Sequence, residues 1–121
     1  MRTHDWQTGI RAAMWDNRLP STRSLYYRLP RRSGATTFLV EVANEAAASG
    51  RRVLFLVKDR GSTHLVKDKL SKNVDLKTSD FRGGYHYDMI IGDCLGSETV
   101  DQVSRMVDAA KGLRLFIDTI D

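Results

Sequence analysis

The residues of this sequence whose types and spacing suit a chemical task are in the stretch RRSGATT, at positions 31–37. A glycine turn that leads into a helix presents backbone N–H groups to an anion, and the helix dipole favours the same charge. The hydroxyl of Thr36 is an oxygen ligand of the kind that Mg²⁺ takes together with phosphate groups. These residues therefore suggest the binding of a phosphate-bearing ligand with Mg²⁺.

Alanine occupies the position at which a phosphate-binding loop carries its lysine. That lysine neutralises the outer phosphates, and here Ala35 follows the glycine. The first glycine of the pattern is also missing, because Leu29 stands there. Arg31 or Arg32 could replace the lysine, since a guanidinium binds phosphate well. The residues expected to contact the phosphates are Arg31, Arg32, Ser33, Gly34, Ala35, Thr36 and Thr37.

Strand and helix patterns alternate from residue 24 to the end of the chain. Apolar runs predict strands at 24–29, 53–57, 74–78, 85–94 and 113–117, and helical spacing predicts helices at 4–16, 36–49, 62–72 and 98–111. In the helix at 62–72 we expect Leu65, Val66 and Leu70 to face inward. The alternation predicts an α/β fold, a three-layer sandwich with a mostly parallel sheet of about five strands, whose strand C-termini share one ligand-binding edge.

Length and composition fit a single domain over residues 1–121, with an N-terminal helix within residues 1–20 packed on the core. Cys94 is the only cysteine, which excludes an internal disulfide and favours a reducing compartment. The apolar runs are far shorter than the roughly 20 residues that cross a bilayer. We therefore expect a cytoplasmic protein without membrane contact. His4, His64 and His86 are scattered without the spacing of a zinc site.

The net charge of +4 is unevenly distributed along the chain. Five arginines crowd the approach to the glycine turn: Arg18, Arg23, Arg28, Arg31 and Arg32. Clustered arginine suits the phosphate of a nucleotide or of a nucleic-acid backbone, and the alternative is a solvated basic face. A non-specific nucleic-acid-binding module is thus one function that the charge leaves open.

The segment RRSGATTFLVEVANEAAASGRRVLFLV resembles the Walker A region of P-loop ATPases, above all of phage terminase large subunits and superfamily helicases. YHYDMIIGD is similar to their Walker B strand, FRGGYHYD resembles the segment before it in terminases, and LRLFIDTI is placed like the strand of their next coupling motif. Gln7 resembles their adenine-reading glutamine. The resemblance covers most of the chain. It implies a P-loop NTPase (RecA-like) fold that binds ATP, with Mg²⁺ held by Thr36 and Asp93.

Two catalytic groups of that family have no counterpart here. The family pattern has its lysine at the position of Ala35 and a water-polarising glutamate at the position of Cys94. Removing one preorganised stabiliser of transition-state charge lowers a rate roughly 10²- to 10³-fold. The resemblance therefore implies hydrolysis near background. Glu98 could replace the missing glutamate if the turn at Gly96 folds back.

The leading functional prediction is a catalytically degenerate, phage-related P-loop NTPase-like protein, a pseudo-ATPase that needs no cofactor to fold. It would bind a protein or nucleic-acid partner in DNA packaging, replication or interference with host machinery, a process implied by the resemblance alone. One alternative is an ATP-binding ATPase that uses Arg31 or Arg32 in place of the lysine, and another is the nucleic-acid-binding module. Homo-oligomerisation through the apolar N-terminal helix is compatible with each of these three functions.

In a purely structural alternative, these residues bind no ligand. The loop would then be a strand-turn-helix corner in which Thr36 or Thr37 caps the helix. Asp93 would cap the turn that follows its strand, and Gln7 would lie on a helix surface.

Overall fold

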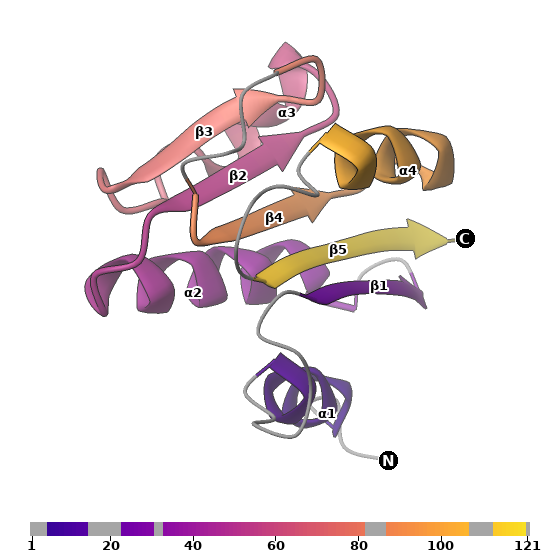
Figure 1. The fold of residues 1–121 in the computed structure, drawn as a ribbon, viewed down its shortest axis with the longest axis horizontal. Coiled ribbons are helices and arrows are strands. Elements are labelled where there is room, and N and C mark those ends of the chain that lie inside the picture. The colour runs from indigo at the N-terminus through magenta and orange to yellow at the C-terminus, as the bar shows by residue number, and fades with distance from the viewer. Residues whose placement is uncertain (1–4, 15–22, 31–32, 82–86, 107–112, 121) are drawn as a thin grey trace.

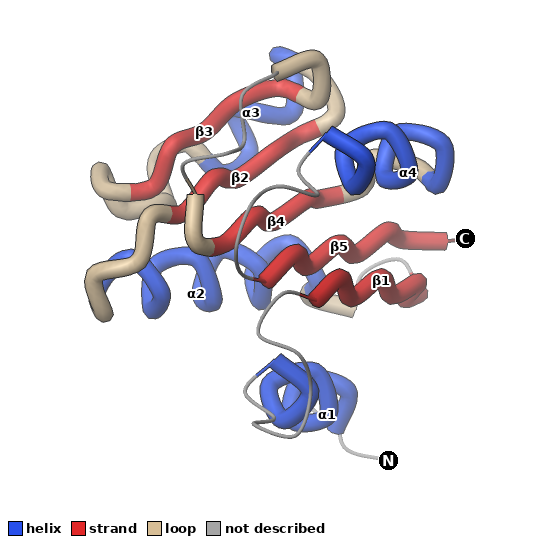
Figure 2. Tube along the Cα trace, in the orientation of Figure 1, coloured by secondary structure: helices blue, strands red, loops and turns tan. Residues whose placement is uncertain are grey.

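The computed structural model describes residues 5–14, 23–30, 33–81, 87–106 and 113–120 (Figures 1 and 2). Each predicted element has a counterpart among them. The largest difference between described ends is in the helix predicted at 62–72, which spans Arg60–Val66. The helices are α1 (Asp5–Met14), α2 (Ala35–Ala48), α3 (Arg60–Val66) and α4 (Ser97–Met106). The strands are β1 (Arg23–Pro30), β2 (Val53–Val57), β3 (Val74–Thr78), β4 (Met89–Asp93) and β5 (Leu113–Ile120).

The strands form a five-stranded sheet in the order β1-β5-β4-β2-β3, and every neighbouring pair is parallel. The prediction of an α/β fold with a parallel sheet of about five strands is confirmed. The last strand, β5, lies between β1 and β4, so β1 forms one edge of the sheet. All strand C-termini lie at the same end of the sheet, and α2 begins at that end (Figure 1).

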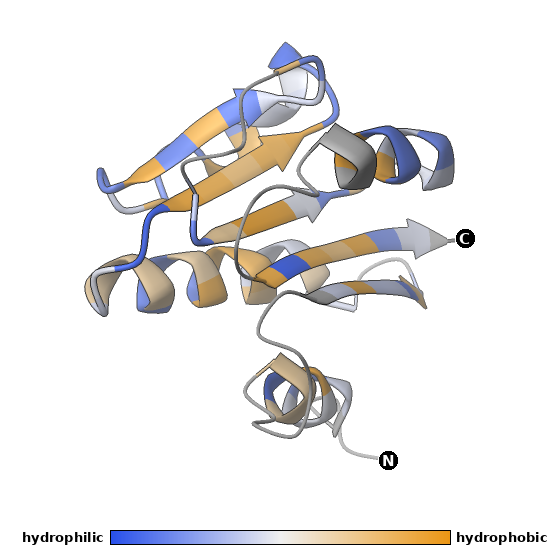
Figure 3. Cartoon of the chain, in the orientation of Figure 1, coloured by the Kyte–Doolittle hydropathy of each residue, from blue (hydrophilic) through white to orange (hydrophobic). Residues whose placement is uncertain are grey.

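Two apolar clusters cover the two faces of the sheet. The larger one joins α1 and α2 to alternate residues of the strands, and the smaller one joins α4 to the other face of β2, β4 and β5. The central strands β2 and β4 are buried along their whole length, whereas β3 at the edge alternates buried and exposed residues (Figure 3). A parallel strand covered on both faces has this continuous apolar character.

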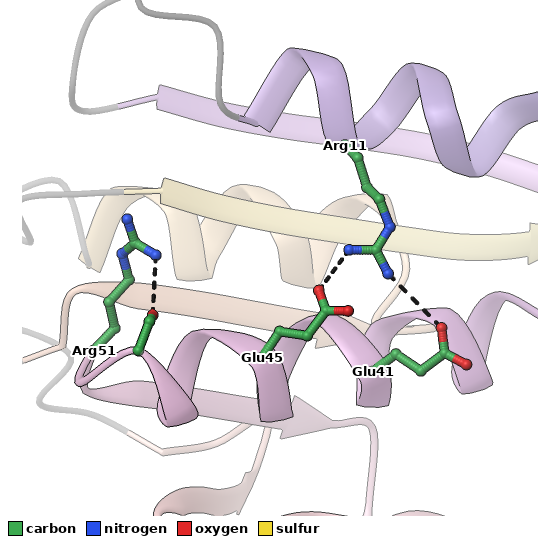
Figure 4. Close-up of polar contacts among 5 residues, drawn as sticks. Arg11, Glu41, Glu45 and Arg51 are labelled. Carbon is green, nitrogen blue, oxygen red and sulfur yellow. Dashed lines mark hydrogen bonds and ion pairs between the residues drawn. The ribbon is translucent and has the colours of Figure 1, made fainter.

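Helix α1 packs on the first half of α2. Ile10 and Met14 are buried in the larger cluster. The ring of Trp6 lies edge-on to the ring of Phe38, with the ring centroids 5.1 Å apart. Arg11 pairs with Glu45 and, at 3.8 Å, with Glu41, both on α2 (Figure 4). Apolar packing of Ile10, Met14 and Trp6 and the ion pairs of Arg11 therefore hold α1 against the core and α2.

Helix α3 differs from its prediction. It begins earlier than expected, because the Asp59 side chain accepts a hydrogen bond of 3.0 Å from the Ser62 N–H and caps the helix there. In the resulting helical phase Val66 faces inward, while Leu65 is 66% exposed. The prediction that Leu65 faces inward is wrong, and Leu70 packs against the core only partly.

In the described part of the chain, every helix is too short or too polar to cross a lipid bilayer.

Candidate functional site

Helix α2 begins directly after a glycine turn at the C-terminal edge of the sheet. The Ser33 N–H donates to the Pro30 carbonyl at 3.3 Å, and Gly34 occupies the N-cap position in the left-handed region, with φ of 83°. The N-cap residue is Gly34 and no described side chain makes a capping hydrogen bond, so the alternative in which Thr36 or Thr37 is the cap is wrong. The N–H groups of the first turn have no acceptor inside the helix, which makes this end of α2 suited to an anion.

The Thr36 side chain contacts Asp93 across the edge of the sheet. Its hydroxyl donates to Asp93 Oδ2 at 3.0 Å. Asp93 ends β4 and is only 9% exposed, and its other oxygen, Oδ1, is buried without a hydrogen-bond partner among the described residues. Burial raises the pKa of Asp93, the hydrogen bonds from Thr36 and from the Cys94 thiol oppose that rise, and the charge of Asp118 adds to it. The structure thus brings together the two residues expected to share a Mg²⁺ ion.

This pair fits a small divalent cation. A buried carboxylate oxygen without a partner costs free energy, and a cation beside it would remove that cost. Mg²⁺ is usually held by one or two carboxylates, with water and phosphate oxygens as its other ligands. The described residues contain no group of three or more His, Cys, Asp or Glu side chains that could hold a metal by themselves. A cation at Asp93 would therefore need a ligand such as a nucleotide to complete its shell.

Ala35 lies where a lysine is expected, and its side chain is 3% exposed within the larger apolar cluster. It brings no charge to the edge of the sheet. Arg31 and Arg32, the predicted substitutes, lie outside the described residues. Ser33 is half-buried, and its Oγ has no hydrogen-bond partner within the described chain, while Thr37 is exposed. Between Ser33 and Thr37 the groups suited to phosphate are backbone N–H groups and hydroxyls.

Cys94 follows Asp93 in a strained conformation. Its φ of 55° lies in the left-handed region, which non-glycine residues seldom adopt and which is often found at functional sites. Its N–H donates to the Ile117 carbonyl at 2.9 Å, and its Sγ lies 3.4 Å from the Thr119 hydroxyl oxygen. Burial raises the pKa of the thiol, so it stays protonated at neutral pH. A neutral thiol turned toward β5 does not replace a carboxylate base.

Glu98, the other candidate for that base, lies in the first turn of α4 and is exposed. Across the described residues, no hydrogen bond joins it to Thr36 or Asp93. Gly96, before it, adopts φ of 87°.

Sequence reasoning missed a second buried acid at this edge, Asp118 of β5. It is 8% exposed, accepts a hydrogen bond from the Tyr26 hydroxyl and accepts another from the Gly96 N–H at 3.3 Å. Burial and the bond to Asp118 raise the pKa of Tyr26, so the phenol remains the donor. Asp118 therefore joins β1, β5 and the loop after β4. Its signal in the sequence is an aspartate directly after an apolar run, the same signal that identified Asp93.

Gln7 is half-buried on α1, next to the Trp6 ring that packs on Phe38. Within the described parts of the chain, no hydrogen bond joins Gln7 to Thr36 or to Asp93.

Comparison of the sequence with protein-family models gives no match, and comparison with curated proteins gives none at a significant level.

Proposed function

We propose that this chain is a P-loop-type nucleotide-binding domain that holds a Mg²⁺-bound nucleotide weakly and does not hydrolyse it. The main support is the hydrogen bond of 3.0 Å between the Thr36 hydroxyl and the Asp93 carboxylate. It links the first turn of the helix after the glycine turn to the end of another strand, which is the pairing that a shared Mg²⁺ site requires. When bound, Mg²⁺ would offset the negative charge of the phosphates.

The absence of hydrolysis rests on two positions. Ala35 gives the outer phosphates no positive charge, and Cys94 offers a neutral thiol where a carboxylate would polarise water. Phosphoryl transfer depends on charge stabilisation and on a positioned nucleophile. With both groups missing, we expect turnover near the uncatalysed rate.

The proposed role of such a domain is binding rather than catalysis. The nucleotide would be a ligand that stabilises the loop, and the domain would act on a protein or nucleic-acid partner. DNA packaging, replication and interference with host machinery are the processes that the resemblance to terminases and helicases suggests.

Ala35→Lys is expected to strengthen binding of a fluorescent ATP analogue with Mg²⁺ at least about tenfold, because it restores a charge-assisted contact to phosphate. Ala35→Met is the matched control, since it adds a stem of similar length without the charge. Both variants enlarge a side chain that is 3% exposed, so both should lose some stability. Fluorescence anisotropy would measure the affinities. Equal affinity of the Lys and Met variants would contradict the proposed phosphate site.

Phosphate release from ATP tests the absence of hydrolysis separately. Neither the natural chain nor Ala35→Lys should release phosphate above background, because Cys94 is unchanged in both. Turnover by the natural chain would contradict the proposal and favour the ATPase in which Arg31 or Arg32 replaces the lysine.

A further inference from the structure

A pocket of about 410 Å³ lies at the end of the sheet opposite to Asp93 and Thr36. Residues near the end of α2 and near the starts of β2 and β3 line the pocket. Its residues are Ala47, Gly50, Arg51, Arg52, Val53, Asn73, Asp75 and Tyr87. Pockets of roughly 300 to 1,000 Å³ with an apolar floor and a few polar groups are typical of small-molecule sites.

The floor of the pocket is apolar and belongs to the core. Ala47 and Val53 are 7% and 1% exposed, and both belong to the larger apolar cluster. Two hydrogen bonds close the turn that follows α2. The Gly50 N–H donates to the Ala47 carbonyl and the Arg51 N–H to the Ala46 carbonyl, each at 3.1 Å. These bonds satisfy carbonyls at the end of α2 and reduce the negative potential there. The floor is therefore a rigid surface suited to an apolar group.

Two consecutive cationic residues, Arg51 and Arg52, line the pocket. Arg51 lies at the end of α2, where a guanidinium nitrogen is 3.3 Å from the Ser49 hydroxyl (Figure 4). The Arg52 N–H donates to Asp88 Oδ2 at 2.9 Å, and its Nε lies 3.6 Å from the same oxygen. This anchors the backbone and the base of the guanidinium, while the Arg52 side chain stays 66% exposed. A guanidinium with this exposure can bind a carboxylate or a phosphate group through its planar set of N–H donors.

The rest of the lining includes one carboxylate, that of Asp75, and the phenol of Tyr87. The Tyr87 hydroxyl donates to Asp75 Oδ2 at 2.6 Å, which partly occupies that carboxylate and fixes the ring. Burial and the bond to Asp75 raise the pKa of Tyr87 to about 12, so the phenol does not add a negative charge at neutral pH. Of the charged residues that line the pocket, Arg51 and Arg52 are cationic and Asp75 is anionic. Asp88, which does not line the pocket, offsets part of the charge of Arg52. The lining itself therefore carries more positive than negative charge, which suits a negatively charged ligand.

We propose that this pocket is a second binding site, separate from the nucleotide site, for a small organic anion with an apolar body and one phosphate or carboxylate group. The apolar body lies on Ala47 and Val53, and the anionic group pairs with Arg52 and Arg51. The inference does not depend on the proposed nucleotide function, because it uses none of the same residues.

The test is titration of the ¹⁵N-labelled chain with phenyl phosphate, followed by NMR amide shifts. A ligand of this size should bind with a dissociation constant of about a millimolar. Shifts are expected at Gly50, Arg52 and Asn73. Benzylammonium, which has the same ring and the opposite charge, should cause none there.

Arg52→Gln should weaken phenyl phosphate binding about tenfold, because it removes a charge-assisted contact. Arg60→Gln, the same change at an exposed arginine of α3, is the matched control and should have no effect. Asp75→Asn keeps an acceptor for Tyr87, removes a negative charge and should strengthen binding. The spectra themselves show whether each variant is folded.

Three outcomes would overturn the proposal: no shifts around the pocket, stronger binding of benzylammonium, or equal affinity of Arg52→Gln and Arg60→Gln. The first of these outcomes includes shifts confined to residues 33–37, which would support the nucleotide site instead. Shifts at the pocket would support this second site whether or not the nucleotide site at residues 33–37 also responds.

Discussion

Asp93→Asn is expected to abolish Mg²⁺-dependent nucleotide binding and, at the same time, to make the ligand-free domain more stable. The asparagine oxygen can still accept the hydrogen bond from Thr36, so the contact between α2 and β4 is kept. The buried charge, whose second oxygen has no partner among the described residues, is removed. We expect a gain of about 1 kcal/mol in the free energy of unfolding, or a rise of about 4 °C in Tm. Thermal unfolding and nucleotide titration with Mg²⁺ would measure the two effects.

The gain should depend on pH. Burial raises the pKa of Asp93 in the folded chain above the value of an unfolded aspartate. Between these two pKa values the folded chain binds more protons than the unfolded chain, so the free energy of unfolding falls as the pH rises. The difference between Asp93→Asn and the natural chain should therefore be small at acidic pH, below the unfolded pKa of about 3.9. It should reach its full size once the pH exceeds the raised pKa of Asp93 in the folded chain.

Asp118→Asn is the matched control for stability. Asp118 is equally buried, but each of its oxygens accepts a hydrogen bond, one from the Tyr26 hydroxyl and one from the Gly96 N–H. The same substitution should here lower stability by about 1 kcal/mol, because an amide cannot accept both bonds. A loss of stability in Asp93→Asn equal to that in Asp118→Asn would contradict the view that Asp93 is held for a ligand.

Phe38→Ala is expected to lower the free energy of unfolding by about 3 to 5 kcal/mol. Phe38 is fully buried in α2, its ring meets the edge of Trp6, and the Arg11 guanidinium lies 5.1 Å from the ring centre. The substitution would leave a cavity and remove the surface on which α1 rests. Urea unfolding would measure the loss, and amide hydrogen exchange should show reduced protection in α1 compared with β2 and β4.

Phe81→Ala is a suitable comparison, because Phe81 packs only partly on the smaller cluster and lies near Tyr87 rather than α1. Its cost should be smaller, about 1 to 2 kcal/mol, and α1 should keep its protection. An equal cost for the two substitutions would show that Phe38 does not hold α1 in the way described.

Much of the fold could be predicted because the apolar pattern is strong where the sheet is covered on both faces. Val53 to Val57 is an uninterrupted apolar run, and it forms β2 with the predicted ends. Helix α3 was harder, because it has one fully buried residue, Val66, and its start depends on a local cap at Asp59. A pattern with so few apolar residues does not fix the helical phase, and the inward position of Leu65 was wrongly predicted.

The candidate site could be predicted in part. Asp93 is the last residue of its strand and Thr36 follows the end of another. In a parallel sheet the C-terminal ends of the strands lie at the same end of the sheet. Apolar patterning does not give the order of the strands, so the insertion of β5, which brings Asp118 to this edge, was not foreseen. Nor could the burial of Ala35 be predicted, because it depends on how the first turn of α2 packs on the core. The role of these residues in binding nucleotide remains a prediction.

The most direct test of the proposed function is titration of the natural chain with a fluorescent ATP analogue at moderate salt, once with Mg²⁺ and once with EDTA, followed by anisotropy. We predict weak, saturable binding with Mg²⁺ that becomes at least about tenfold weaker with EDTA, because Asp93 would then face the phosphates without a cation between them. Affinity that is the same with and without Mg²⁺, or no binding under either condition, would contradict the assignment of Thr36 and Asp93 to a Mg²⁺-nucleotide site.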